Sequence, residues 1–172
     1  MFPYSEEISL SATLKVNYQV VLDQLLPQIT AERQKRFDEV LAHRTFEVAT
    51  VCEGIYDRGN ISAVVRSAEA FGFAPFHIIE RDDKFKNSQR VTRGADKWIE
   101  EKKWQDSQAA IKYLKSENRK LIVTSLDANI SIDEIDFSRP VALVMGNEKD
   151  GVSDLMKSSA DYRIKILMYG FV

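Results

Sequence analysis

Apolar residues recur at three- and four-residue spacing over residues 60–73, which predicts a helix with one buried face. Asn60 is a candidate cap, because its side-chain oxygen can accept a backbone N–H of the first turn, and Gly72 is a typical stop signal. Taken alone, this segment is a surface helix that carries one solvated arginine, Arg66. The residues of the predicted apolar face are Ile61, Val64, Val65, Ala68 and Phe71.

Apolar runs elsewhere alternate with helical patterns in strand, helix, strand order, which favours a parallel sheet flanked by helices and an α/β fold. Ligands of such sheets bind outside the carboxyl ends of the strands, so Thr124, Ser125 and Gly146 are candidate ligand contacts. Strands are predicted at residues 46–55, 74–80, 121–126, 140–145 and 162–168, and further helices at 107–118 and 152–159.

The N-terminal part is less informative. Residues 1–29 predict an extension with a short amphipathic helix that ends near Pro27, and residues 30–172 form the expected main domain. Thr30 is a candidate cap for the next helix, which is locally basic. Such a helix is either a solvated face or a surface for phosphate groups. Its arginines include Arg33, Arg36 and Arg44.

Residues 81–103 are polar and lean basic, with Trp98 and Trp104 between the charges. Two interpretations remain open for this segment. It is a long surface loop anchored by two tryptophans, or it is a nucleic-acid surface in which cations meet phosphates and rings pack on bases.

Composition narrows the class of protein. A chain of 172 residues with 44% hydrophobic residues suits one globular domain, and the net charge of −2 gives no overall signal for nucleic acid. The single cysteine, Cys52, excludes an internal disulfide and a cysteine-based metal cluster, and its apolar surroundings predict a buried, inert thiol. We find no pattern of a signal peptide or membrane span, so a cytoplasmic protein is expected.

A glycine-bounded loop, Gly146-Asn-Glu-Lys-Asp-Gly151, directly follows one predicted strand and offers Glu148 at its tip. Two glycines permit a tight turn with close backbone approach to a ligand. The chain has neither a P-loop nor a Gly-x-Gly-x-x-Gly fingerprint, which argues against ordinary nucleotide hydrolases and dinucleotide oxidoreductases.

Three stretches together resemble, in order, the motifs of the SpoU branch of the SPOUT RNA methyltransferases. They are Asn60-x-x-Ala-x-x-Arg66 with Phe71-Gly72, then Gly146-x-Glu-x-x-Gly-Val, then Ile164-x-Ile166-x-Met168-x-Gly170. Within that branch, Thr30-x-Glu-Arg33 through Arg44, and Gly94-Ala-Asp-Lys97-Trp98, look most like the tRNA (guanosine-2′-O-)-methyltransferases that act on the D-loop guanosine.

The resemblance implies a SPOUT-type α/β knot, a homodimer, tRNA as substrate, S-adenosyl-L-methionine as cofactor, and no metal. Arg66 would be the main catalytic residue, and Asn60 and Glu148 would be the other catalytic-site residues. The cofactor would contact Thr124, Ser125, Leu126, Gly146, Ile166, Met168 and Gly170, and the RNA would contact Arg33, Arg36, Arg44, Arg93 and Lys97.

The chain also departs from the family pattern. The third motif of the family continues beyond Gly170, whereas this sequence stops at Val172, and Leu167 stands where the family usually has proline. We therefore expect a C-terminus clipped within the third motif, which would leave the knot, the cofactor site and the dimer incomplete. The alternative function is a catalytically silent, RNA-binding relative that has lost cofactor binding.

Overall fold

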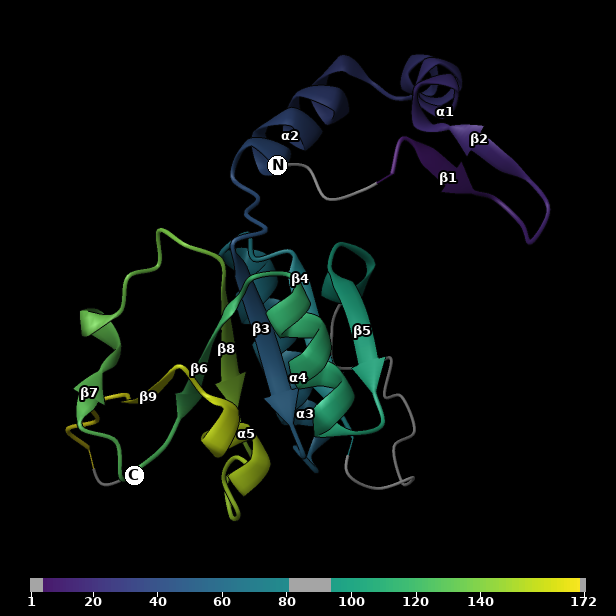
Figure 1. The fold of residues 1–172 in the computed structure, drawn as a ribbon. Helices are drawn as coiled ribbons and strands as arrows, with labels where there is room; N and C mark the ends of the chain where they lie inside the picture. The colour runs from purple at the N-terminus through teal and green to yellow at the C-terminus, as the bar shows by residue number, and fades with distance from the viewer. Residues whose placement is uncertain (1–4, 81–93, 171–172) are drawn as a thin grey trace. The chain divides into compact units, whose positions relative to one another are not determined.

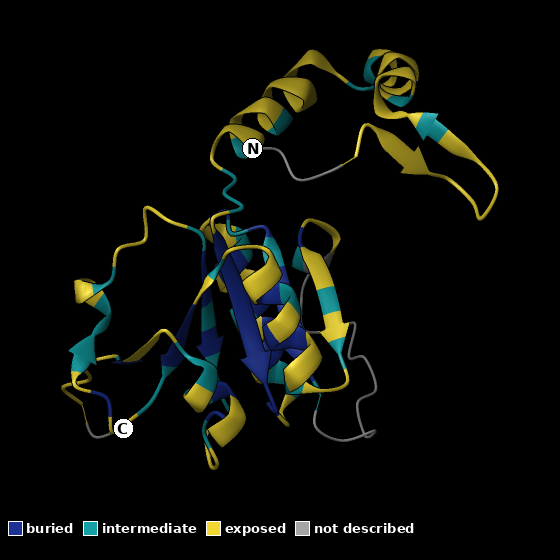
Figure 2. Cartoon of the chain, viewed as in Figure 1, coloured by how far each residue is buried: buried dark blue, intermediate teal, exposed yellow. Residues whose placement is uncertain are grey.

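The computed structural model describes residues 5–80 and 94–170, which form two compact units, Met1–Arg44 and Thr45–Val172. This division falls after the helix at Thr30, which the sequence placed within the main domain. The first unit contains an antiparallel hairpin and two α-helices, and neither helix has a buried residue (Figure 2). Its elements are β1 (Glu7–Ser9), β2 (Lys15–Asn17), α1 (Tyr18–Leu25), η1 (Leu26–Gln28) and α2 (Ala31–Ala42).

Local capping explains where α2 begins. The Thr30 side chain accepts a hydrogen bond from the Arg33 backbone N–H at 3.2 Å, as the sequence predicts. At its end, the His43 Nδ1–H donates to the Glu39 carbonyl at 2.7 Å. His43 therefore has a structural role at the end of this helix.

The second unit is built on a seven-stranded sheet in the order β5-β4-β3-β8-β6-β9-β7, in which every pair of neighbouring strands is parallel (Figure 1). The predicted α/β fold with a parallel sheet is confirmed. The strands are β3 (Val48–Glu53), β4 (Pro75–Ile79), β5 (Glu100–Trp104), β6 (Lys120–Thr124), β7 (Ile130–Ser131), β8 (Val141–Met145) and β9 (Tyr162–Lys165). The helices are α3 (Arg58–Ala70), η2 (Ala95–Lys97), α4 (Ser107–Ser116), η3 (Ile132–Glu134) and α5 (Asp154–Ser159).

Apolar side chains cover both faces of this sheet. On one face, Ala110 and Leu114 of α4 and Met156 of α5 pack on alternate residues of β3, β6 and β8. On the other face, Ile61 and Val65 of α3 pack on β3 and β4. Burial on both sides explains why the central strands are near-continuous apolar runs, since parallel strands have no solvent-facing side.

The edge strand β5 was not predicted, because its sequence Glu-Glu-Lys-Lys-Trp has the charged composition of a loop. Charged side chains are tolerated at a sheet edge, where they also discourage pairing with other chains. Trp104 ends this strand and packs against His77 and Tyr113, with ring centroids 6.0 and 5.1 Å away. Trp104 is thus a partly buried packing residue at the edge of the sheet.

Candidate functional site

Helix α3 begins earlier than its sequence suggests. Asp57 is the cap, because its carboxylate accepts the Gly59 backbone N–H at 2.6 Å, so the prediction that Asn60 caps this helix is wrong. An aspartate three residues upstream has the same capping chemistry and takes the position first. Asn60 therefore lies inside the first turn, where its side chain is available for another partner.

That partner is Glu148. The Asn60 Nδ2–H donates to Glu148 Oε1 across 88 positions of sequence, and both residues are exposed. The structure thus brings together two of the three residues that the sequence assigned to catalysis. A carboxylate that accepts from the carboxamide nitrogen fixes the amide, so that the Asn60 carbonyl oxygen can accept a hydrogen bond from a ligand.

The loop that carries Glu148 is closed on itself. Asn147 and Gly151 form an antiparallel bridge, with N–H···O distances of 3.3 and 2.8 Å. A Cβ on Gly146 would lie 2.3 Å from the Gly151 carbonyl carbon, so only glycine fits at this position. Asn147 is buried, and its Oδ1 accepts from the backbone N–H of Lys149 at 2.8 Å. The loop is therefore a preformed frame that presents Glu148 at its tip.

Sequence reasoning missed two anchors of this loop, Asn147 and Glu53. Asn147 donates from Nδ2 to the Gly54 carbonyl at 3.2 Å. Glu53 is fully buried at the end of β3 and accepts from the Ser153 N–H and hydroxyl at 2.8 and 2.7 Å. The sequence did place one acidic residue, Glu53, at the carboxyl end of an apolar strand. A carboxylate buried there needs specific hydrogen-bond partners, so this position could have indicated an anchor.

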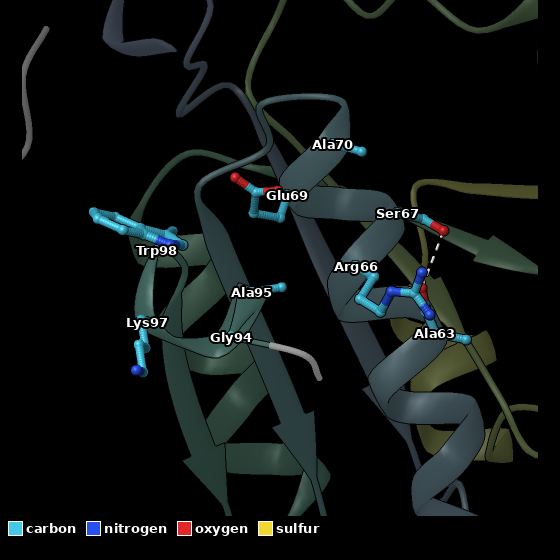
Figure 3. A pocket seen from close by; sticks show the side chains of 9 residues that line it. All are labelled: Ala63, Arg66, Ser67, Glu69, Ala70, Gly94, Ala95, Lys97 and Trp98. Atoms are coloured by element: carbon cyan, nitrogen blue, oxygen red, sulfur yellow. Dashed lines mark hydrogen bonds between the residues drawn. The ribbon is translucent and has the colours of Figure 1, made fainter. Parts of the chain in front are cut away.

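Arg66 lies apart from the Asn60–Glu148 pair. Six helical residues correspond to a rotation that leaves the two side chains about 120° apart and about 9 Å along the axis. Arg66 is exposed and lines an open pocket of about 900 Å³ between α3 and η2. In Figure 3 its guanidinium lies along α3 beside Ala63 and Ser67, while Lys97 and Trp98 come from the opposite wall. Within one chain, Arg66 and the Asn60–Glu148 pair therefore lie on different faces of α3.

The predicted cofactor contacts meet at one edge of the sheet. β6 lies between β8 and β9, and the register pairs Val123 with Val144 and Thr124 with Ile164, so the three strand ends are adjacent. Ser125 donates its N–H to the Ile164 carbonyl at 2.8 Å. The Thr124 hydroxyl donates to the Val144 carbonyl at 3.1 Å and so packs within the sheet.

Beyond these strand ends, the chain exposes apolar side chains. β9 ends at Lys165, which is earlier than the predicted Met168, and the residues that follow are exposed. Leu126 is 95% exposed, Ile166 51% and Met168 60%, and Gly170 is exposed as well. These exposed apolar side chains, together with Gly146, which has no side chain, suit a ligand with a flat, apolar ring system. The residues present therefore fit a nucleoside-containing cofactor.

The predicted RNA contacts fall in both units. Arg33 and Arg36 are exposed on α2, where Arg36 pairs with Glu39 at 3.6 Å and the Arg33 guanidinium lies over the Phe37 ring at 5.5 Å. Arg44 is half-buried just after α2, and Lys97 is exposed on η2. Arg93 lies outside the described residues.

Cys52 has the environment that the sequence predicts. Its side chain is 1% exposed within the α3 face of the sheet, and burial raises the pKa of its thiol to about 12. Among residues 5–80 and 94–170 there is no group of three or more potential metal ligands. No helix in that described part is long and apolar enough to cross a membrane.

A parallel sheet covered by helices, with a glycine-bounded loop at its carboxyl edge, defines a ligand-binding α/β domain. Residues 47–172 match the model of the SpoU rRNA Methylase family, and the chain belongs to this family. The chain is 34% identical, over 144 residues, to a tRNA (guanosine(18)-2′-O)-methyltransferase of Borreliella burgdorferi. That alignment covers 83% of this chain and 66% of the relative, so the chain spans just under two thirds of the relative's length.

Solved structures show the same fold. The TrmH/SpoU tRNA-modifying enzyme of A. aeolicus superposes with a TM-score of 0.72 at 29% identity, over 82% of this chain and 73% of that one. The SpoU methyltransferase AviRb of Streptomyces viridochromogenes, in complex with AdoMet, superposes with a TM-score of 0.66 at 20% identity, over 78% of this chain and 53% of that one. The predicted resemblance to the SpoU branch is confirmed.

Proposed function

We propose that this protein transfers a methyl group from S-adenosylmethionine to a ribose 2′-hydroxyl of tRNA, at a guanosine of the D-loop. The observation that carries the proposal is the hydrogen bond between Asn60 and Glu148, which joins two separate family motifs at the carboxyl edge of the sheet. A tRNA substrate is supported by the name of the relative from Borreliella burgdorferi, and it would place the protein in the cytoplasm.

Bound S-adenosylmethionine supplies an electrophilic methyl group. We assign its binding to the turn after β6, to Gly146 and to the residues after β9, where the exposed apolar side chains of Leu126, Ile166 and Met168 would flank its adenine ring. Gly170 offers backbone groups at the same edge. Ser125 is held there by its N–H bond to the Ile164 carbonyl, and Thr124 holds β6 to β8 beneath it.

The chain's polar residues then position the acceptor ribose. Transfer to a hydroxyl requires in-line approach and removal of a proton from a weak acid, and water at this exposed site receives that proton. Asn60, fixed by Glu148, accepts a hydrogen bond from the ribose. A guanidinium carries a positive charge and several N–H donors, so Arg66 orients the phosphate and stabilises negative charge that develops on the oxygen.

We further propose that the active protein is a homodimer with a C-terminal knot, as the family resemblance implies. Support for an interface comes from the separation, along α3, of Arg66 from the Asn60–Glu148 pair, because a second copy would complete the site by bringing its own arginine to the pair. The basic side chains Arg33, Arg36, Arg44, Arg93 and Lys97 would contact the tRNA backbone, which positions a substrate without reading its sequence.

The proposal is tested by incubating the protein with a tRNA transcript and S-adenosylmethionine that carries a labelled methyl group. Nuclease digestion and mass spectrometry should find the label in 2′-O-methylguanosine from the D-loop. An Asn60→Ala variant should lose at least about tenfold in rate, because its ribose contact is removed. Label on a base, or no label with the unaltered protein, would refute the proposal.

A further inference from the structure

Glu53 is a buried carboxylate that the proposed chemistry does not use. It ends β3, the strand flanked by β4 and β8, and its side chain is 0% exposed. Its Oε1 accepts from the hydroxyls of Ser107 and Ser153 at 2.5 and 2.7 Å, and its Oε2 accepts from the Ser153 backbone N–H at 2.8 Å. One carboxylate therefore joins the first residue of α4 to the cap of α5.

Packing alone does not account for an acidic residue at this place. Burying a carboxylate is unfavourable unless hydrogen bonds compensate for the lost water, and an apolar residue would fill a core position without that requirement. The donors that compensate come from two helices on the same side of the sheet as the core around Leu114 and Met156. What Glu53 adds over an apolar residue is a fixed position for Ser153.

Ser153 lies two residues after Gly151, so its position fixes one end of the Gly146–Gly151 loop. The other end is fixed by Asn147, whose Nδ2 donates to the carbonyl of Gly54, the residue next to Glu53. The chain before Glu148 is thus attached to Gly54 and the chain after it to Glu53, two adjacent residues at the end of β3. A shift of this strand end would move Glu148 relative to Asn60, which is on α3.

We propose that Glu53 is a positioning residue, whose buried carboxylate sets the loop so that Glu148 meets Asn60. Its consequence for catalysis rests on the proposed function, whereas its consequence for the loop does not. Glu53 acts on the loop through its hydrogen bonds to Ser153.

Ser153→Ala and Ser107→Ala each remove one hydroxyl from the same Oε1, and Ser153→Ala also removes the cap of α5. Ser153→Ala should lower kcat about tenfold while the KM for tRNA changes less than twofold, since displacing a reacting group weakens the transition state more than the ground state. Ser107→Ala should leave kcat unchanged. Equal values of kcat in the two variants would overturn the proposal.

Variants of Glu53 itself give a second measurement. Glu53→Ala should lower kcat about a hundredfold, and Glu53→Gln should recover most of that loss, because a carbonyl oxygen still accepts the Ser153 N–H and rotating hydroxyls can accept from the amide. A kcat for Glu53→Gln no higher than that of Glu53→Ala would contradict positioning by hydrogen bonds. If Glu53→Ala does not fold, the comparison of Ser153→Ala with Ser107→Ala still tests the proposal.

Amide hydrogen exchange separates this proposal from the proposed function. The Lys149 and Gly151 amides donate within the loop, to Asn147 Oδ1 and to the Asn147 carbonyl. They should exchange at least about tenfold faster in Ser153→Ala and at the original rate in Ser107→Ala. If the unaltered protein transfers no methyl group, only the proposed function is refuted. If amide exchange in Ser153→Ala is unchanged, the positioning role of Glu53 is refuted.

Discussion

Replacing Gly146 by alanine should disrupt the loop that carries Glu148, by an amount that the structure allows to be worked out. The added Cβ would lie 2.3 Å from the Gly151 carbonyl carbon and from the Val152 nitrogen. Ordinary contacts begin near 3.4 Å, so the two sides of the loop must separate by about 1 Å. That movement breaks the paired hydrogen bonds between Asn147 and Gly151. Two bonds of about 1 kcal/mol each give a loss of about 2 kcal/mol in the free energy of unfolding.

Scanning calorimetry and a methyl-transfer assay measure the two consequences. For a chain of this size, a loss of about 2 kcal/mol lowers the Tm by about 4 to 8 °C. Because Glu148 moves with the loop, the transfer rate should fall about a hundredfold. Gly170→Ala is the control for stability, since a Cβ there meets nothing within 4 Å and should leave the Tm unchanged. A Gly146→Ala protein with an unchanged Tm would show that the loop is not closed as described.

Three further predictions concern single side chains. Arg66→Ala should reduce methyl transfer at least about a hundredfold, because the developing charge loses its cation, while calorimetric titration finds unchanged cofactor affinity; a retained rate would remove Arg66 from the chemistry. Burial, and then the charges of Arg119 and Lys102, lower the pKa of His77 to about 4, so the unfolded state alone gains a proton as pH falls through about 6.5. Urea unfolding should therefore show about 2 kcal/mol less stability at pH 5 than at pH 7, and His77→Asn should reduce this difference. Cys52, with a pKa raised to about 12, should react with a thiol reagent only after unfolding, and reaction in the native protein would contradict its burial.

Local chemistry allowed several element ends to be predicted from the sequence. Thr30 caps its helix as expected, and Gly72 ends α3 at a positive φ of 77°. There the Phe73 N–H donates to the Ala68 carbonyl and the Gly72 N–H to the Glu69 carbonyl, which is a Schellman motif. These features depend on residues within one turn of each other, so a single stretch of sequence contains the relevant information.

Features that depend on tertiary contacts were predicted less well. Phe71 completes the apolar spacing of α3, but it is the C-cap residue beyond the last helical residue and is 72% exposed. The charged strand β5 is recognisable only once β4 is beside it. Asn60 and Arg66 were placed in one site by the order of motifs, whereas helix geometry separates them.

The pairing of Asn60 with Glu148 was predictable only from the order of the family motifs. The two residues lie 88 positions apart, and only the family pattern suggested that they belong together. The anchors beneath them, Glu53 and Asn147, contact the loop through hydrogen bonds that no periodicity reveals. Those contacts become visible only when β3 and β8 are paired.

The central claim is that the methyl group goes to the 2′-hydroxyl of a tRNA guanosine. Two tRNAs identical except at the D-loop guanosine, one with its ribose and one with a 2′-deoxyribose at that single position, test it most directly. With labelled S-adenosylmethionine, the ribose substrate should accept one methyl group per tRNA and the deoxyribose substrate none. Equal labelling of both tRNAs would contradict the account, because the acceptor would then be another atom.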